Sequence, residues 1–99
     1  MVKLTVLYGN PEDPAAFDNY YQNMHAPLAE RIPNLQRFEA GRVASLDESE
    51  PPDHLIAELW FESADVLQES MSSPEGQAAA DDIPNFATGG VTMFVSEVS

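Results

Sequence analysis

The strongest constraint in this sequence is a set of strand-like segments that carry large apolar side chains on both faces. Residues 2–8, 54–62 and 91–98 alternate between two sets of side chains with the two-residue period of a β-strand. In residues 54–62 the first set is Leu55, Ala57, Leu59 and Phe61, and the second is Ile56, Glu58 and Trp60. A sheet with apolar residues on both faces needs a cover on each face.

A helix is expected after the first strand. Asp13 followed by Pro14 is a favourable N-cap pair, because the aspartate accepts an amide hydrogen bond and proline suits the first turn. Apolar residues then recur at steps of four, three and four, at Phe17, Tyr21, Met24 and Leu28. Pro27 lies inside this pattern and should kink or break the helix, because it removes the hydrogen bond to the carbonyl of Asn23.

The remaining segments complete the order of elements. Residues 35–46 predict a second strand, with one side formed by Phe38, Ala40, Ala44 and Leu46. Ser63 and Ser73 are expected to cap two short helices, one through Met71 and one over residues 75–82, before the last strand. The order is therefore β-α-β-β-α-β, the arrangement of the α+β ferredoxin-like fold with a four-stranded antiparallel sheet.

Helices in this fold cover one face of the sheet, so the second apolar face needs another partner. The simplest cover is the same sheet of a second copy, packed face to face about a twofold axis. The chain is thus expected to form a homodimer, as a dimeric α/β barrel. The alternative is that the helices cover more apolar surface than the pattern suggests.

Composition narrows the possible partners. The 99 residues fit one domain (1–99), and 17 acidic against four basic residues give a formal charge of −13. Such a charge repels phosphate groups, so neither nucleic acid nor a membrane surface is an expected partner. The chain has no cysteine, and neither a signal peptide nor a membrane-spanning stretch is evident, which favours a cytoplasmic protein. The acidic surface fits selection for solubility, with a high-salt host as the alternative.

His25 is the principal candidate for chemistry. It follows Tyr21 by four residues and Asp18 by seven, so the three side chains can share one side of the helix. It also precedes the expected break at Pro27, where free backbone carbonyls would stabilise an imidazolium. A histidine of near-neutral pKa beside a phenol suits general acid–base catalysis. From spacing alone, the alternative of a histidine that only caps the helix end is favoured.

Other residues are weaker candidates. His54 opens the third strand after a proline-rich loop, where an exposed position is expected. Trp60 and Glu58 share one strand face. They would contact a ligand if that face lined the barrel, and would belong to the core if helices covered it. Phe38 is a candidate pocket residue, although phenylalanines more often belong to the core.

Several kinds of site are not indicated. There is no G-x-G-x-x-G or phosphate-binding loop, and no G-x-S-x-G nucleophile motif. The two histidines are far apart and lack metal-binding spacing, so no metal site is expected. We therefore expect no cofactor, and any catalysis would use side-chain acid–base groups beside an apolar pocket.

Two blocks of the sequence resemble the EthD family. Residues 20–43 contain an aromatic-x-x-x-His-x-Pro-Leu signature, and residues 59–90 contain the pieces SPEGQ and DIPNF. The resemblance covers nearly the whole chain. It implies a dimeric α/β barrel, related in fold to small monooxygenases, muconolactone-type isomerases and polyketide cyclases or dehydratases.

The same resemblance bears on individual residues. It implies a functional role for His25, with Tyr21 and Pro27 shaping its position. It also implies that Asn85 and Phe86 lie over the pocket mouth, although stabilisation of their loop is the favoured alternative.

Three hypotheses for function follow. The first is a cofactor-independent enzyme that binds a small hydrophobic molecule, cyclic or polyketide-like, and uses His25 and Tyr21 in an isomerisation, cyclisation or dehydration. The second is a non-catalytic accessory protein that binds an intermediate of an oxidative ether- or aromatic-degradation pathway. The third is a cofactor-independent monooxygenase, an oxidoreductase acting on an electron-rich phenol.

Overall fold

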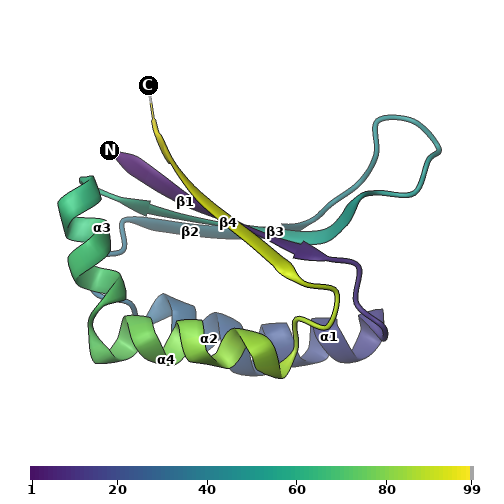
Figure 1. The fold of residues 1–99 in the computed structure, drawn as a ribbon, viewed down its shortest axis with the longest axis horizontal. Coiled ribbons are helices and arrows are strands. Elements are labelled where there is room, and N and C mark those ends of the chain that lie inside the picture. The colour runs from purple at the N-terminus through teal and green to yellow at the C-terminus, as the bar shows by residue number, and fades with distance from the viewer. Residues whose placement is uncertain (99) are drawn as a thin grey trace.

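Four antiparallel strands form one sheet in the order β2-β3-β1-β4 in this computed structural model, which describes residues 1–98. The strands are β1 (Val2–Gly9), β2 (Arg37–Arg42), β3 (Asp53–Phe61) and β4 (Val91–Glu97). The helices are α1 (Pro14–Tyr20), α2 (Ala26–Glu30), α3 (Ala64–Met71) and α4 (Pro74–Asp82). In Figure 1 the labelled helices lie on one side of the sheet, with α3 at its end. The predicted ferredoxin-like βαββαβ fold is confirmed.

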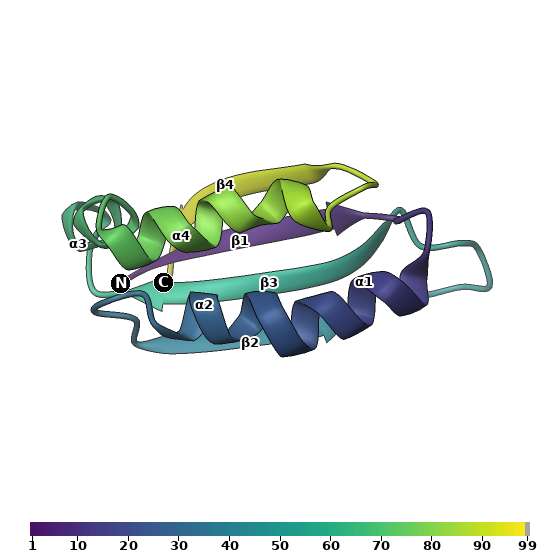
Figure 2. The same cartoon turned by 90° about the horizontal axis from the view of Figure 1, so that it is seen from below.

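The core lies between the sheet and the helices. Its strand residues are Val2, Leu4, Val6 and Tyr8 from β1 and Leu55, Ala57, Leu59 and Phe61 from β3. The register places Leu4 opposite Leu59 and Val6 opposite Ala57, so the two-residue period brings both sets to one face. Each large side chain buried here contributes roughly 1.5–3 kcal/mol. Figure 2 shows α1 and α2 running beside α4 beneath this face.

The opposite face of the sheet is bare in a single chain (Figure 1). Glu58 and Trp60 lie on this face, as the alternation predicts, and Lys3 Nζ pairs with a Glu58 carboxylate oxygen at 2.8 Å. The charged groups of Lys3 and Arg37 lie 5.5 and 4.9 Å from the centre of the Trp60 ring. Phe94 in β4 is 48% exposed. Large apolar groups on this face therefore meet solvent in the isolated chain.

The predicted helix starts are confirmed by their capping hydrogen bonds. Asp13 accepts from the Ala16 amide at 3.1 Å. Ser63 accepts from the Val66 amide at 3.2 Å at the start of α3, and Ser73 accepts from the amide of Gly76 at 3.1 Å at the start of α4. Each cap satisfies an amide that has no partner within its own helix.

The first helix does not break at Pro27, although a break was one of the two predicted outcomes, a kink or a break. A π-helical turn (Tyr21–His25) joins α1 to α2, and the backbone remains helical from Pro14 to Glu30. The amide of Ala26 donates to the carbonyl of Tyr21, five residues earlier. Because a π-helical turn already departs from the four-residue spacing, it accommodates the missing proline amide without ending the helix.

The second strand is shorter than predicted. It covers Arg37–Arg42 rather than residues 35–46, and Leu46 is fully exposed. Residues 43–52 instead form the β2–β3 connection, which projects beyond the sheet in Figure 1. The ladder with β3 ends at the Arg42–Leu55 pair. One backbone hydrogen bond beyond it joins the Val43 amide to the His54 carbonyl, next to the start of β3 at Asp53.

Candidate functional site

His25 is buried beneath the sheet with a polar partner at each ring nitrogen. Its side chain is 5% exposed, and Nδ1 lies 2.9 Å from Asp82 Oδ2. Nε2 lies 3.4 Å from the hydroxyl of Tyr8. The three residues come from the π-helical turn, the last position of α4 and the far end of β1. Only the folded chain brings them together.

The surroundings favour a neutral His25 with its proton on Nδ1. Burial lowers the pKa of His25, and this effect outweighs the hydrogen bond and negative charge of Asp82, which raise it. The Nδ1–H then donates to Asp82, and the Nε2 lone pair accepts from the Tyr8 hydroxyl. A carboxylate that orients an imidazole and stabilises its protonated form is the arrangement used in general base catalysis.

Asp82 is fixed by three hydrogen-bond donors. The Tyr20 hydroxyl donates at 2.6 Å and the Asn85 amide at 3.0 Å, in addition to His25. Desolvation raises the pKa of Asp82, but these hydrogen bonds together outweigh it and lower that pKa. The bond to Asp82 in turn raises the pKa of Tyr20. Asp82 is therefore ionised at neutral pH, where His25 is neutral.

A small cavity lies beside His25 and opens to solvent. Its polar side chains are Tyr8, Tyr21 and His25. The rest of the lining is apolar and consists of Leu4, Val6, Ala29, Ile32, Phe38, Ala57, Leu59, Met71, Ala79, Ala80, Ile83 and Met93. An apolar cavity with a few convergent polar groups suits a small, mostly hydrophobic molecule.

The Tyr21 hydroxyl is buried and has no hydrogen-bond partner among the described residues. Burying a hydroxyl in this way costs about 1–3 kcal/mol. Burial also raises the pKa of both Tyr8 and Tyr21. The nearby Tyr21 and Asp82 raise the pKa of Tyr8 further, and Glu30 raises that of Tyr21. Both phenols therefore remain protonated and can serve as hydrogen-bond donors.

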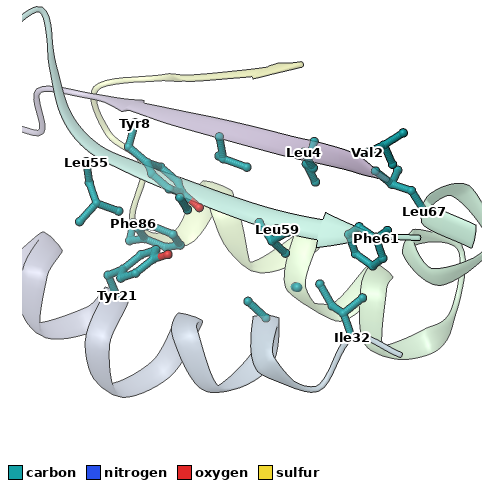
Figure 3. Packing of buried hydrophobic residues seen from close by; sticks show 14 of the residues in the cluster. Val2, Leu4, Tyr8, Tyr21, Ile32, Leu55, Leu59, Phe61, Leu67 and Phe86 are labelled. Atoms are coloured by element: carbon teal, nitrogen blue, oxygen red, sulfur yellow. The ribbon is translucent and has the colours of Figure 1, made fainter. Parts of the chain in front are cut away.

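Aromatic packing holds these side chains in place. The Phe86 ring lies 4.7 Å from the His25 ring, centre to centre, and Phe17 stacks on Tyr21 at 6.0 Å. Figure 3 shows the hydroxyl ends of Tyr8 and Tyr21 pointing into the space between β3 and the helices, with Phe86 beside them.

The structure brings some of the predicted site residues together. Tyr21 and Phe38 line the same cavity as His25. Asn85 touches this site through Asp82, and Phe86 packs against the imidazole. Phe86 is only 5% exposed, so it lies inside the cluster rather than over a mouth.

Trp60 and Glu58 do not join this group. Both lie on the bare face of the sheet, whereas their strand neighbours Leu59 and Ala57 face the cavity. Any contact that they make with a ligand would belong to a different surface from that of His25.

The expected surroundings of the two histidines are partly wrong. His54 is 6% exposed rather than at the surface, and its Nε2 lies 2.7 Å from Asp18 Oδ1. Asp18 pairs with both His54 and Arg42, so its carboxylate is a partner of His54 and not of His25. His25 is stabilised by Asp82 rather than by free carbonyls at a helix end, because the helix continues beyond it.

Tyr8 and Asp82 were not predicted as site residues. Tyr8 is one of the apolar positions of the first strand pattern, and Asp82 is the first residue of DIPNF. The signal available for Asp82 was its place in that motif, three residues before Asn85. Nothing in the local pattern links either residue to His25, which lies 17 residues from Tyr8 and 57 from Asp82.

Comparison with known proteins extends this description. The EthD domain model matches residues 10–90. The chain belongs to the EthD family. It is 46% identical over 97 residues to an uncharacterised 11.0 kDa protein from the thcB–thcC intergenic region of Rhodococcus erythropolis. The match covers 98% of this chain and 94% of that relative.

Solved structures agree with the EthD assignment. An ethyl tert-butyl ether D (EthD) family protein from Bacillus halodurans superposes with a TM-score of 0.94 at 36% identity, covering 100% of this chain and 99% of the other. A dimeric protein of unknown function from Bacteroides fragilis, with a ferredoxin-like fold, gives a TM-score of 0.70 at 18% identity. That match covers 98% of this chain and 95% of the other and shows the shared fold.

In residues 1–98 of this EthD protein, no group of three or more histidine, aspartate or glutamate side chains is placed to hold a metal ion. No helix in that range has the length and apolar character needed to cross a membrane.

Proposed function

We propose that this EthD protein binds a small hydrophobic molecule, cyclic or polyketide-like, and transforms it by acid–base chemistry at His25. An isomerisation, cyclisation or dehydration is the matching class of reaction. The observation that carries the proposal is the Asp82–His25 pair, because His25 lines an apolar cavity and its Nε2 lies beside the hydroxyl of Tyr8, another lining residue. This chemistry would take place in the cytoplasm, which a chain without cysteine suits.

In the proposed reaction His25 moves a proton. Nε2 accepts a proton from the bound molecule, and the Asp82 carboxylate stabilises the imidazolium that forms. The imidazolium then returns the proton to a second atom of the substrate. Because the cavity lining is largely apolar, it excludes water and strengthens the interaction between the imidazolium and Asp82.

We also propose that the functional unit is a homodimer formed through the bare face of the sheet. The supporting observation is the exposure of large apolar groups there, including Phe94, in a single chain. The Bacteroides fragilis protein of similar fold is described as dimeric. Packing the two sheets face to face would cover both sets of apolar residues and leave each His25 cavity in its own protomer.

Native mass spectrometry of the purified protein tests assembly and ligand together. We expect a dimer that retains a small hydrophobic molecule, which is then identified and incubated with the wild type, His25→Gln and His54→Gln. Loss of conversion in His25→Gln, with conversion retained in folded His54→Gln, supports the proposal, because His54 is the buried histidine outside the cavity.

Three results would contradict the proposed function. Recovery of the molecule unchanged after long incubation would indicate an accessory binding protein. Oxygen consumption during conversion would indicate a monooxygenase. Full turnover by His25→Gln would remove the histidine from the reaction.

A further inference from the structure

Two tyrosine hydroxyls lie at the cavity beside His25, and neither has a strong partner. Tyr21 is 6% exposed and its hydroxyl has no partner among the described residues. Tyr8 is 1% exposed, and its hydroxyl makes only the 3.4 Å contact with His25 Nε2. Buried hydroxyls in folded proteins are almost always hydrogen-bonded, so this pair calls for an acceptor.

Neither ring is free to turn its hydroxyl toward solvent. Tyr21 is stacked on Phe17 and meets the Tyr8 ring edge-on at 5.7 Å. Tyr8 is also packed against Phe86 at 5.4 Å. In Figure 3 both hydroxyl ends point into the same space. The rings therefore hold two donors in fixed positions toward the cavity.

We propose that Tyr8 and Tyr21 together bind one oxygen atom of the ligand, the carbonyl oxygen of a small cyclic ketone whose remaining surface is apolar. The inference rests on the proposed function, since it places the carbonyl next to the base. Apart from His25, these two hydroxyls are the polar side-chain groups of the cavity lining. The rest of the ligand would therefore contact apolar side chains.

The tyrosine pair also completes a balanced proton transfer. When the ketone binds, the Tyr8 O–H turns from His25 Nε2 to the carbonyl oxygen, which leaves the Nε2 lone pair free to act as the base. His25 Nε2 removes a proton from the carbon next to the carbonyl, and the electron pair of that C–H bond forms a carbon–carbon double bond. The carbonyl π electrons move to the oxygen, which accepts hydrogen bonds from both phenols as its negative charge develops. The imidazolium then returns the proton to carbon or to oxygen, so the step is an isomerisation without an oxidant or reductant.

The test compares two probes that differ in one acceptor, cyclohexanone and methylenecyclohexane. Their binding is measured by NMR titration of the labelled protein. The wild type should bind the ketone more tightly, and Tyr21→Phe should reduce this preference by roughly tenfold, the contribution of about one hydrogen bond. Tyr21→Phe should also raise the Tm of the ligand-free protein, because it removes the unpartnered hydroxyl.

A control variant removes a buried polar group outside the cavity. His54 pairs with Asp18 and does not line the cavity, so His54→Gln should leave the preference for the ketone unchanged. An unchanged preference in Tyr21→Phe, or equal binding of the two probes by the wild type, would overturn the inference. The absence of any cyclohexanone binding would overturn it as well.

A second readout separates this inference from the proposed function. Exchange of the cyclohexanone α-hydrogens in D2O reports proton abstraction, and it should be lost in His25→Gln and slowed in Tyr21→Phe. If Tyr21→Phe keeps both the ketone preference and the exchange rate while His25→Gln loses exchange, the tyrosine pair is wrong and the role of His25 stands. If the ketone preference depends on Tyr21 but no exchange occurs, the oxygen site stands and the catalytic proposal fails.

Discussion

At the scale of single residues, the behaviour of His25 depends on two opposing effects. Burial disfavours the imidazolium, while the adjacent carboxylate of Asp82 favours it. The balance leaves a neutral imidazole whose Nε2 is available as a base. Tyr20 and Asn85 matter to the same balance because they keep Asp82 ionised and in position.

Replacing the carboxylate should weaken the base. In Asp82→Asn the pKa of His25 should fall further, because the charge and the hydrogen bond that raise it are removed while burial remains. NMR titration of the His25 ring carbons measures this shift directly. Asp81→Asn, at the exposed neighbouring position, provides the control and should leave the titration unchanged. A His25 pKa that rises or stays constant in Asp82→Asn would contradict the assigned geometry.

The lowered pKa of His25 also predicts how stability changes with pH. Below the ordinary value of 6.5 the unfolded chain binds a proton at this residue before the folded chain does. Stability that is fully present above pH 6.5 is therefore lost as the pH falls toward the folded-state pKa. The groups that face the imidazole are Asp82, Tyr8 and Tyr21, and none of these is cationic.

Urea unfolding at pH 7.5 and pH 5.0 measures this effect. The loss of unfolding free energy between the two values should be smaller in His25→Gln, which cannot take up the proton. An equal loss in the wild type and in His25→Gln would mean that the histidine is not held in its neutral form.

At the scale of elements, the junction between α3 and α4 controls where Asp82 lies. Gly76 in the first turn of α4 sits against the end of α3, and a Cβ added there would come within 2.3 Å of the Ser70 carbonyl oxygen. A glycine is needed because the two helix backbones approach closely. Asp82 is the last residue of the same helix, so a shift of α4 also displaces the partner of His25.

Gly76→Ala should destabilise the protein by about 1–3 kcal/mol, as expected when a crowded site is overpacked. Helix propensity alone predicts the opposite effect, because alanine favours a helix over glycine and would raise the free energy of unfolding by about 1 kcal/mol. Ala78 is an exposed residue of α4, so Ala78→Gly measures the difference in helix propensity without the close contact with α3 that Gly76 makes. Urea unfolding gives both values. A more stable Gly76→Ala protein would show that α4 is free to move away from α3.

At the scale of the whole molecule, the two faces of the sheet have separate roles. One face packs on the helices and holds the His25 cavity, while the other carries Trp60, Phe94 and the Lys3–Glu58 ion pair and has no helix over it. A domain of this size buries a smaller fraction of its surface than a larger domain does, so covering the second face adds to its stability. Homodimer formation is thus expected to affect folding more than the chemistry of the cavity.

A charge placed on the bare face should disrupt the dimer. Phe94→Asp introduces a carboxylate at a half-exposed position, so the single chain should still fold while the two sheets no longer pack. Sedimentation velocity should then show a monomer. Met24→Asp adds the same charge at a position of the first helix that is 56% exposed and should remain dimeric. A Phe94→Asp protein that stays dimeric would place the interface elsewhere.

The sequence by itself determined the elements that depend on local physics. Strand faces follow from the two-residue period, and the helix starts follow from side chains at Asp13, Ser63 and Ser73 that bond an amide three residues away. The resemblance of its motif predicted a functional role for His25, and that role stays a prediction. The end of the second strand was misjudged at Leu46, and the helix continues past Pro27, because the end of a strand and the accommodation of a proline depend on the surrounding structure.

Only the tertiary structure decided the partners of His25. Asp82 and Tyr8 are brought to its two ring nitrogens by the packing of α4 and β1, and no local spacing encodes that meeting. The burial that lowers the pKa of His25 arises only when the helices close over the sheet. The same packing leaves the Tyr21 hydroxyl without a partner among residues 1–98. These are properties of contacts between residues distant in the chain, whereas helix caps and strand faces are properties of residues that are near neighbours.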